Sequence, residues 1–546
     1  MAIVWIVVFW RLGYPSLIDP DEAHYAELTR EMLQSGNWLV PLLDGKPFID
    51  KPVLFHWLQG ASVLLLGETE FAARLPTGLA ALGLFAITRW VGAALFNAEV
   101  GTLGAIMFAT IPATFVLSNI AIFDMVFALF VFGAVGCLLV AAKQSSTRIE
   151  LCGYGLLTLG LMTKGPVALV LVALFLAAAF VASSETRVLV RRLHWKVGLP
   201  AVLIVASPWF LWMGWRFGAE FVSGYLLAGN LWYFTQPVEF SGRAINHTFY
   251  LRAFAGAFFP WSAIVVGRGV DAVRRVRSGQ PLSSAEVLLW LWILVVVGFF
   301  SVARFKLDHY IFPAAPACCL IAAHAWREAA RDAEGRLWGT RYSVLVIAGL
   351  LIVGGSFGGV YLSKIDLALP PSALLLPLAL FAGGVALMFQ AERRRWGVPA
   401  GAGVLVTMLL VCYSTVVVVG FPVLEQVRPT AQVARILARS TPVAAPVALY
   451  RLERWRASLR YYLNRPVQRL ETIDEARTFL QQPNPVYVVM LRRDYLELRH
   501  QNIPVYLMTA HRAVVGTTGR GLRRQRWGFL VVATNRPHRS SDRHTK

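Results

Sequence analysis

The sequence predicts a polytopic α-helical membrane protein with a small α/β domain at its C-terminal end. Hydrophobic residues make up 57% of the 546 residues, and charged residues only 15%. Apolar stretches recur at close to the length that crosses a bilayer, and the short connections between them are rich in Arg and Lys. Because so many stretches of this length cannot all be cores of soluble domains, the sequence favours a membrane protein.

About thirteen stretches have the character of membrane spans, each of which needs roughly 20 apolar residues. They centre on residues 1–12, 71–92, 99–117, 120–142, 150–163, 165–183, 197–217, 252–267, 285–302, 308–323, 342–362, 372–390 and 399–421. The first is short, so we expect the sequence to begin inside the first transmembrane helix. Residues 51–67 are also apolar but start with Lys-Pro and contain His56 and Gln59, a pattern typical of an interface helix.

The charge of the connections predicts the orientation of the spans. The basic connections are expected in the cytoplasm under the positive-inside rule: they are residues 143–148, 183–196, 267–279, 324–341 and 391–397. Alternating spans then place residues 13–53, the turn before Asp124, Lys164, residues 218–251 and residues 303–310 on the outer side. The net charge of +21 follows from this arrangement, and we expect no nucleic-acid partner. The polar candidates for catalysis share the outer face, which predicts a chamber open to both water and lipid.

After Phe421 the pattern changes to short β-branched runs alternating with amphipathic stretches, which predicts an α/β domain. We expect a membrane domain over residues 1–421 with a large first outer loop at 13–70, an outer domain over 422–535, and a solvated basic tail at 536–546. The five cysteines are expected to be small buried side chains rather than disulfide partners or metal ligands: Cys137, Cys152, Cys318, Cys319 and Cys412.

The outer loops hold the candidate site residues. Asp19, Asp21 and Glu22 precede a helical pattern, so Asp21 is either a helix cap or a general base. Asp124 opens an apolar helix, where an ionisable group is costly unless it has a function or a partner. Lys164 lies between two spans, but the following Gly-Pro is also compatible with a plain turn.

Basic residues of the outer loops are candidates for binding a phosphate group near hydrocarbon. Lys46 and Lys51 either extend toward lipid headgroups or bind such a phosphate. Near the next span the candidates are Arg304, Lys306, Asp308, His309 and Tyr310, which are also ordinary types of interface anchor. The long outer loop adds Arg243 and His247. A divalent metal held by Asp50 and His247 is a weak hypothesis, because two ligands have no recognisable spacing; no other cofactor is expected.

Residues 20–58, "PDEAHYAELTREMLQSGNWLVPLLDGKPFIDKPVLFHWL", closely resemble the first outer loop of bacterial GT-C glycosyltransferases of the protein-mannosyltransferase-related superfamily. Within it they look most like the lipid A aminoarabinose transferases. The resemblance continues through "EFAARLPTGLAALG", the Asp in "IAIFDMVFALF", and "KLDHYIFPAAP", and covers most of residues 15–320. The last part of the chain matches only in general architecture.

The resemblance implies a multispan enzyme that moves a sugar from a polyprenyl phosphate to an acceptor such as lipid A. It assigns Asp21 and Asp124 as the two catalytic acids, and Lys51 and Tyr310 to the donor phosphate. Asp50 stands where the aminoarabinose transferases usually have Glu. The chain also departs from them at two positions: His24 replaces an Arg and Phe48 replaces a Tyr. The sugar therefore stays open between aminoarabinose, another pentose, a uronic acid and a hexose.

Our hypothesis is an inverting displacement in which Asp21 accepts the acceptor's proton. Lys51, Arg243 and Lys306 would stabilise the phosphate that leaves, and Glu22, His24, Asp50 and His309 would contact the substrates. We expect a monomer in the bacterial inner membrane with its active site facing the periplasm. A lipid-sugar flippase is disfavoured because transporters place charges at the midplane and show internal repeats. A GT-C transferase acting on protein or on another glycan is a further alternative.

Overall fold

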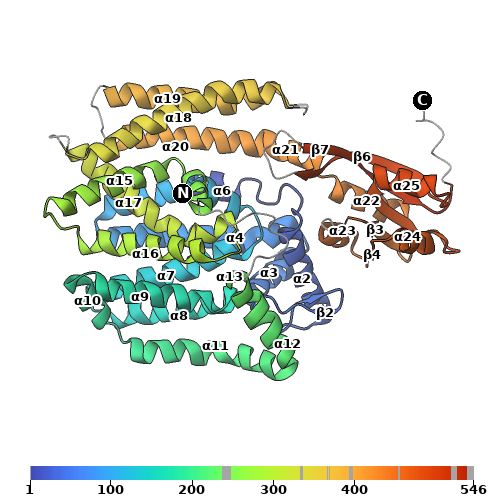
Figure 1. The fold of residues 1–546 in the computed structure, drawn as a ribbon, viewed down its shortest axis with the longest axis horizontal. Helices are drawn as coiled ribbons and strands as arrows, with labels where there is room; N and C mark the ends of the chain where they lie inside the picture. The colour runs from blue at the N-terminus through green and yellow to red at the C-terminus, as the bar shows by residue number, and fades with distance from the viewer. Residues whose placement is uncertain are drawn as a thin grey trace. The chain divides into compact units, whose positions relative to one another are not determined.

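The computed structural model describes the chain except residues 1, 236–247, 333–335, 366, 368, 393–397, 453–455, 518–524 and 538–546. The chain forms two compact units (Figure 1). The first contains residues 1–12, 37–41 and 47–417, and the second contains residues 13–36, 42–46 and 418–546. The sequence assigned the whole first outer loop to the membrane domain, whereas most of residues 13–46 group with the C-terminal residues.

The first unit is helical. Its longer helices are α3 (Leu54–Leu66), α4 (Glu70–Leu95), α5 (Ala98–Thr110), α6 (Pro112–Ser118), α7 (Phe123–Gln144), α8 (Thr147–Lys164), α9 (Val167–Ala182), α10 (Ser184–Arg191), α11 (Trp195–Phe217), α14 (Phe249–Ala257), α15 (Trp261–Arg277), α16 (Ser284–Val302), α17 (Ala315–Arg331), α18 (Trp338–Ser363), α19 (Leu375–Glu392) and α20 (Val398–Thr415). Shorter pieces are α1 (Ala2–Val4), η1 (Trp5–Phe9), α12 (Ala219–Phe221), η2 (Val222–Trp232), α13 (Tyr233–Thr235), η4 (Asp308–Ala314) and η5 (Pro371–Leu374). Segment η6 (Val416–Gly420) crosses the boundary between the units.

Helix α7 lies inside the first unit, and nearly all of its residues are buried, including Phe127, Val131 and Leu138. A helix that is apolar on every side can be covered in this way by neighbouring helices. Close packing also depends on glycine where α4 meets α5: a Cβ on Gly92 would lie 2.6 Å from the Gly101 Cα. A larger residue at either position would force these two helices apart.

Among the described residues, seven helices are long and apolar enough to cross a membrane, or up to nine if two bent pairs each count as one span. The protein is therefore a multi-pass membrane protein, but the count of thirteen spans is not confirmed. Several predicted spans are short or broken: α9 has 16 residues, and α5 and α6 meet at an angle of 64°. The predicted interface segment contains the 13-residue apolar helix α3.

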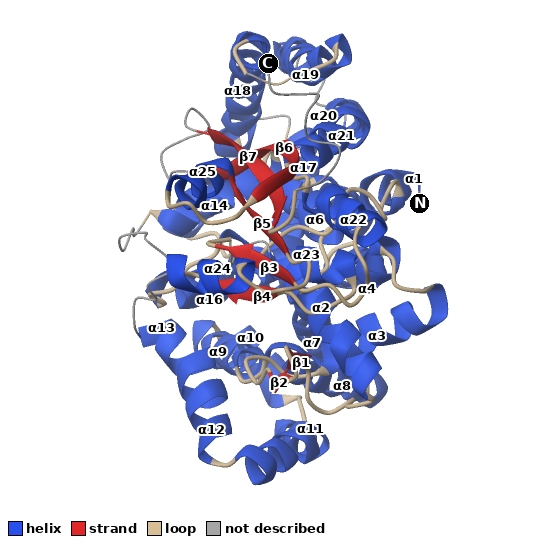
Figure 2. Ribbon diagram, turned by 90° about the vertical axis from the view of Figure 1, so that its right-hand side faces the viewer, coloured by secondary structure: helices blue, strands red, loops and turns tan. Residues whose placement is uncertain are grey.

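The second unit begins with α2 (Asp21–Ser35) and the short strands β1 (Leu42–Leu43) and β2 (Lys46–Pro47). Its C-terminal part contains α21 (Phe421–Val427), α22 (Thr430–Ser440), β3 (Val447–Tyr450), α23 (Arg456–Leu463), β4 (Gln468–Leu470), α24 (Ile473–Leu480), β5 (Tyr487–Leu491), α25 (Arg492–His500), β6 (Tyr506–Thr517) and β7 (Gln525–Thr534). Strands β3–β7 form one sheet in the order β4-β3-β5-β7-β6 (Figure 2). Strand β3 pairs in parallel with β4 and β5, and β7 is antiparallel to β5 and β6.

Strand residues alternate between two apolar layers, as the period of two along a strand requires. Val447 and Leu449 of β3 pack in the layer that contains α22 and α23. Ala448 and Tyr450 pack in the layer that contains α24 and α25. Helices therefore cover both faces of this sheet.

Candidate functional site

A buried ion pair joins the beginning of α7 to the end of α8. Lys164 Nζ lies 2.5 Å from Asp124 Oδ1, and the two side chains are 13% and 9% exposed. Asp124 is in the first turn of α7, where the helix N-terminus favours an anion, and Lys164 is in the last turn of α8, where a cation is favoured. The helix ends therefore support the charge of each partner.

Two residues of η4 complete this cluster. His309 Nε2 lies 3.5 Å from Asp124 Oδ2, and the Lys164 ammonium lies 4.6 Å from the centroid of the Tyr310 ring. The structure thus brings together Asp124, His309 and Tyr310, which the sequence had selected separately. The structure adds Lys164, which would be missed if the segment were interpreted as a plain turn. The sequence feature that could have identified it is a lone cation between two apolar spans, on the same predicted face as Asp124.

The turn after Lys164 is fixed by its glycine. Gly165 has φ +80°, a conformation that side chains rarely adopt, and an added Cβ would lie 2.1 Å from the Tyr225 hydroxyl. Tyr225 is itself completely buried in η2. Gly165 therefore lets a tyrosine from a distant segment pack directly beside Lys164.

Asp50 and Lys51 form a second pair of charges near the first. Lys51 Nζ lies 3.0 Å from Asp50 Oδ2, with the side chains 16% and 31% exposed. Lys51 is within electrostatic range of Asp124. Phe55 of α3 packs against Phe123 of α7 with 4.6 Å between ring centroids, which holds this segment beside α7. An anion that binds here must compete with a carboxylate for each of the two ammonium groups.

Lys306 has a different environment from the one expected of a phosphate ligand. Its ammonium donates to the carbonyls of Phe300, Ser301 and Ala303 at 3.2, 2.5 and 2.5 Å. A lysine has three N–H donors, so these bonds account for all of them at the C-terminal end of α16. Burial also lowers the pKa of Lys306. We therefore leave Lys306 out of the proposed phosphate site.

The acids of the first outer loop lie in the second unit. Asp21 is exposed and is the first residue of α2, with Pro20 in the capping position. Glu22 is buried, and its Oε2 accepts from the Ile18 N–H at 2.9 Å, so that carboxylate closes the start of its own helix. His24 is half-buried, with its ring edge-on to Tyr25 at 5.8 Å. Of these side chains, Asp21 is the most open to solvent, and His24 is partly accessible.

The segment before and through α2 is held by α23. The Asp19 carboxylate accepts from the Ser458 N–H at 3.1 Å and from its hydroxyl. Arg460 Nε lies 2.7 Å from Glu27 Oε1, and the same guanidinium pairs with Glu31 and Asp44. The side chain of Glu27 is completely buried, so it depends on Arg460 and on Arg30, whose Nη2 also lies 2.7 Å from Oε1. None of these contacts was foreseen from the sequence.

The remaining candidates are not placed. Arg243 and His247 lie outside the described residues. The described residues hold no group of three or more His, Cys, Asp and Glu side chains suited to a metal ion. The hypothesis of a metal between Asp50 and His247 therefore stays a prediction.

The comparisons with known proteins agree with the sequence resemblance. Residues 50–212 match the family model described as dolichyl-phosphate-mannose-protein mannosyltransferase. The structure superposes on the crystal structure of ArnT from Cupriavidus metallidurans bound to undecaprenyl phosphate with a TM-score of 0.75, at 20% identity, over 98% of this chain and 97% of that one. The chain therefore has the fold of this ArnT structure. An oligosaccharyltransferase from Archaeoglobus fulgidus is more distant, with a TM-score of 0.51 at 11% identity over 89% and 68% of the two chains.

Two curated relatives are named as undecaprenyl phosphate-alpha-4-amino-4-deoxy-L-arabinose arabinosyl transferases. The protein from Serratia proteamaculans is 26% identical over 59% of each chain. The protein from Sodalis glossinidius is 28% identical over 62% of this chain and 61% of its own. The chain thus matches about three fifths of the length of these relatives. The family model covers Asp50, Lys51, Asp124 and Lys164 but not Asp21 or η4.

We expect Asp19 to give the second unit a pH-dependent stability. Burial raises the pKa of Asp19 from its ordinary 3.8 to about 7. Between about pH 4 and 7 the unfolded chain loses this proton while the folded chain keeps it, so stability falls as pH rises. Asp19→Asn keeps an acceptor for Ser458 and should melt at an increasingly higher temperature than wild type over this range. Thermal unfolding measured from pH 4.5 to 7.5 tests this, with the exposed Asp474→Asn as control. A difference in melting temperature between Asp19→Asn and wild type that does not change with pH would contradict it.

Proposed function

We propose that the protein is an integral-membrane glycosyltransferase that moves a sugar from a polyprenyl-phosphate donor to an envelope acceptor such as lipid A. The observation that carries the proposal is the cluster of Asp124, Lys164, His309 and Tyr310, with Lys51 in electrostatic range. Buried ionisable groups at the end of a membrane helix are costly to maintain and are typical of functional sites. The names of the curated relatives support undecaprenyl phosphate as the lipid carrier.

The donor phosphate is assigned to Lys51, Lys164 and Tyr310. Both lysines are paired with carboxylates at 3.0 and 2.5 Å, so their ammonium groups are already oriented. A polyprenyl phosphate leaves as an anion, and cations held in a site of low dielectric stabilise that developing charge. The proposed role of Asp124 is to hold Lys164 and His309 in position. Arg243, outside the described residues, stays a further candidate.

Asp21 is the proposed general base. Its exposed carboxylate would accept the proton of the acceptor's hydroxyl or phosphate as the oxygen attacks the anomeric carbon, which breaks the bond to the donor phosphate. A single displacement of this kind inverts the anomeric centre. His24 and Asp50 are the proposed contacts to sugar or acceptor, and the replacement of Arg by His at position 24 leaves the sugar open.

The proposed topology places these groups on the periplasmic side of the bacterial inner membrane. The basic connections on the other side support this orientation under the positive-inside rule. The proposed protein has thirteen membrane spans and an outer α/β domain over residues 422–535. Its proposed oligomeric state is a monomer.

Mass spectrometry of envelope glycolipids tests the function directly. Cells that contain the gene should carry a sugar on lipid A or another envelope glycan that cells without it lack. Purified protein should release undecaprenyl phosphate only when both the undecaprenyl-phosphate sugar and the acceptor are present. Identical glycan profiles in the two strains, together with no release of the lipid phosphate, would refute the transferase assignment.

A further inference from the structure

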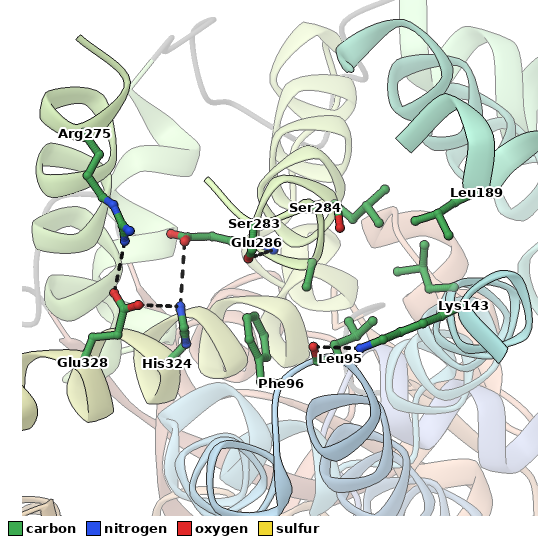
Figure 3. A pocket seen from close by; sticks show the side chains of 13 residues that line it. Leu95, Phe96, Lys143, Leu189, Arg275, Ser283, Ser284, Glu286, His324 and Glu328 are labelled. Carbon is green, nitrogen blue, oxygen red and sulfur yellow. Dashed lines mark hydrogen bonds and ion pairs between the residues drawn. The ribbon is translucent and has the colours of Figure 1, made fainter. Parts of the chain in front are cut away.

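A cavity of 340 Å³ lies among the ends of helices α4, α7, α10, α15, α16 and α17 (Figure 3). It is separate from the Asp124 cluster, because Lys143 lines it nineteen residues further along α7. At 1.5 Å per residue this is a distance of about 28 Å, close to the thickness of the hydrocarbon core. The cavity and the Asp124 cluster therefore lie near opposite ends of α7, a helix long and apolar enough to cross a membrane.

One wall of the cavity is apolar. Leucines from three helices form it together with Leu95 at the end of α4: Leu139, Leu189 and Leu288. The aromatic ring of Phe96 adds to this wall and stacks on His324 with 4.4 Å between the ring centroids. A ligand with a hydrocarbon portion would be sheltered from water along this side.

The other wall carries charges of both signs. Glu286 is buried and is held by two hydrogen bonds from Arg268, at 2.7 and 2.8 Å. Glu328 is more open, with a side chain 32% exposed; its Oε2 lies 2.7 Å from Arg268 and 3.5 Å from Arg275, and its Oε1 lies 3.4 Å from His324. Figure 3 shows Arg275, His324 and Glu328 on one side of the cavity. The accessible anion of this wall is thus Glu328, and its accessible cation is Arg275, which is 36% exposed.

A second cation faces this group from the far side of the cavity. Lys143 donates to the carbonyls of Ala94 and Leu95 at 2.7 and 3.2 Å, and a lysine carries three donors in all. Figure 3 places Lys143 across the cavity from Arg275, with Ser283 and Ser284 at the start of α16 between them. The lining therefore offers two cations for an anion and one carboxylate for a cation.

We propose that this cavity binds the headgroup of an ethanolamine phospholipid. The lipid phosphate would lie between Arg275 and Lys143, and its ammonium would donate to Glu328. The acyl chain would run along the leucine wall. A choline headgroup has no N–H to donate to Glu328, and a glycerol headgroup has no positive charge, so both fit less well. This site is independent of the proposed transferase function, because its readout is lipid binding and not sugar transfer.

Native mass spectrometry of the full chain in detergent tests the proposal. Phosphatidylethanolamine, phosphatidylcholine and phosphatidylglycerol with the same acyl chains are offered at equal concentration. The ethanolamine lipid should be retained about ten-fold or more in excess, as expected for one additional charged hydrogen bond. Equal retention of the three lipids would overturn the proposal.

Matched variants locate the bound lipid. Arg275→Gln and Lys143→Gln should each reduce retention of the ethanolamine lipid about ten-fold. Their controls are Arg277→Gln and Arg148→Gln, exposed residues near the same helix ends that do not line the cavity. Glu328→Gln should remove the preference for ethanolamine over choline while the lipid still binds. Loss of binding in the control variants, or equal binding of soluble phosphoethanolamine, would exclude a lipid site in this cavity.

Discussion

Replacing Asp124 with Asn should reduce sugar transfer by at least about 100-fold, the effect expected when charge stabilisation in the transition state is lost. Without the carboxylate, Lys164 and His309 lose the anion that holds them, at 2.5 and 3.5 Å, in a largely buried site. Transfer per folded molecule, measured with purified protein and a polyprenyl-phosphate donor, is the readout. If Asp124→Asn transfers sugar at the wild-type rate, the Asp124 cluster has no role in the reaction.

The double variant Asp124→Asn with Lys164→Met separates a catalytic role from a structural one. Removal of one partner of a buried pair costs about 3–5 kcal/mol because the other charge is left uncompensated, whereas removal of both is often close to neutral. The double variant should therefore recover thermal stability but not transfer. Recovery of both would mean that the pair serves only the fold.

Asp271→Asn is the matched control for a buried aspartate in the same unit. Asp271 accepts from the backbone N–H groups of Gly339 and Thr340, each at 2.8 Å, and so stabilises the beginning of α18. Its replacement should lower the melting temperature and leave transfer per folded molecule unchanged. An equal loss of transfer in this variant would show that the assay reports general damage.

Replacing Asp21 with Asn should lower kcat by about 10²–10⁴-fold, the usual contribution of a general base. Asp21→Glu should recover part of the rate, since the carboxylate is kept at a longer reach.

Asp474→Asn is the control for a helix effect. Asp474 is exposed in the first turn of α24, as Asp21 is in α2, so both replacements remove a favourable charge at a helix N-terminus. The control should keep full transfer. If Asp21→Asn matches the control and retains wild-type transfer, Asp21 acts only at the helix end and another group is the base.

The fold class and part of the candidate site were predictable from composition and spacing. Asp124 was selected because an acid in an apolar helix is costly, and the structure places it beside His309 and Tyr310 as a site requires. The resemblance to GT-C transferases pointed to the architecture that the comparisons confirm. The fold class and the selection of Asp124 both depend on local pattern, whereas the role of the cluster stays a prediction.

The errors have the opposite cause. Lys164 and Lys306 are both cations in short connections between spans. The sequence does not show that Lys164 pairs with Asp124 while Lys306 donates to three carbonyls. The pairing of the first outer loop with α23 joins residues more than 400 positions apart. The number of spans is not confirmed, because bends and short helices follow from packing rather than from hydropathy.

The division of the second unit between the two ends of the chain imposes an order on its biosynthesis. Asp19 and Ser458 are 439 residues apart, so α2 leaves the ribosome long before α23 exists. At roughly 5–20 residues per second this interval is about 20 to 90 s. During that time Glu27 lacks its partner Arg460, and α2 with Asp21 at its start is not yet held by α23. The second unit can therefore assemble only after the C-terminal part of the chain has been made.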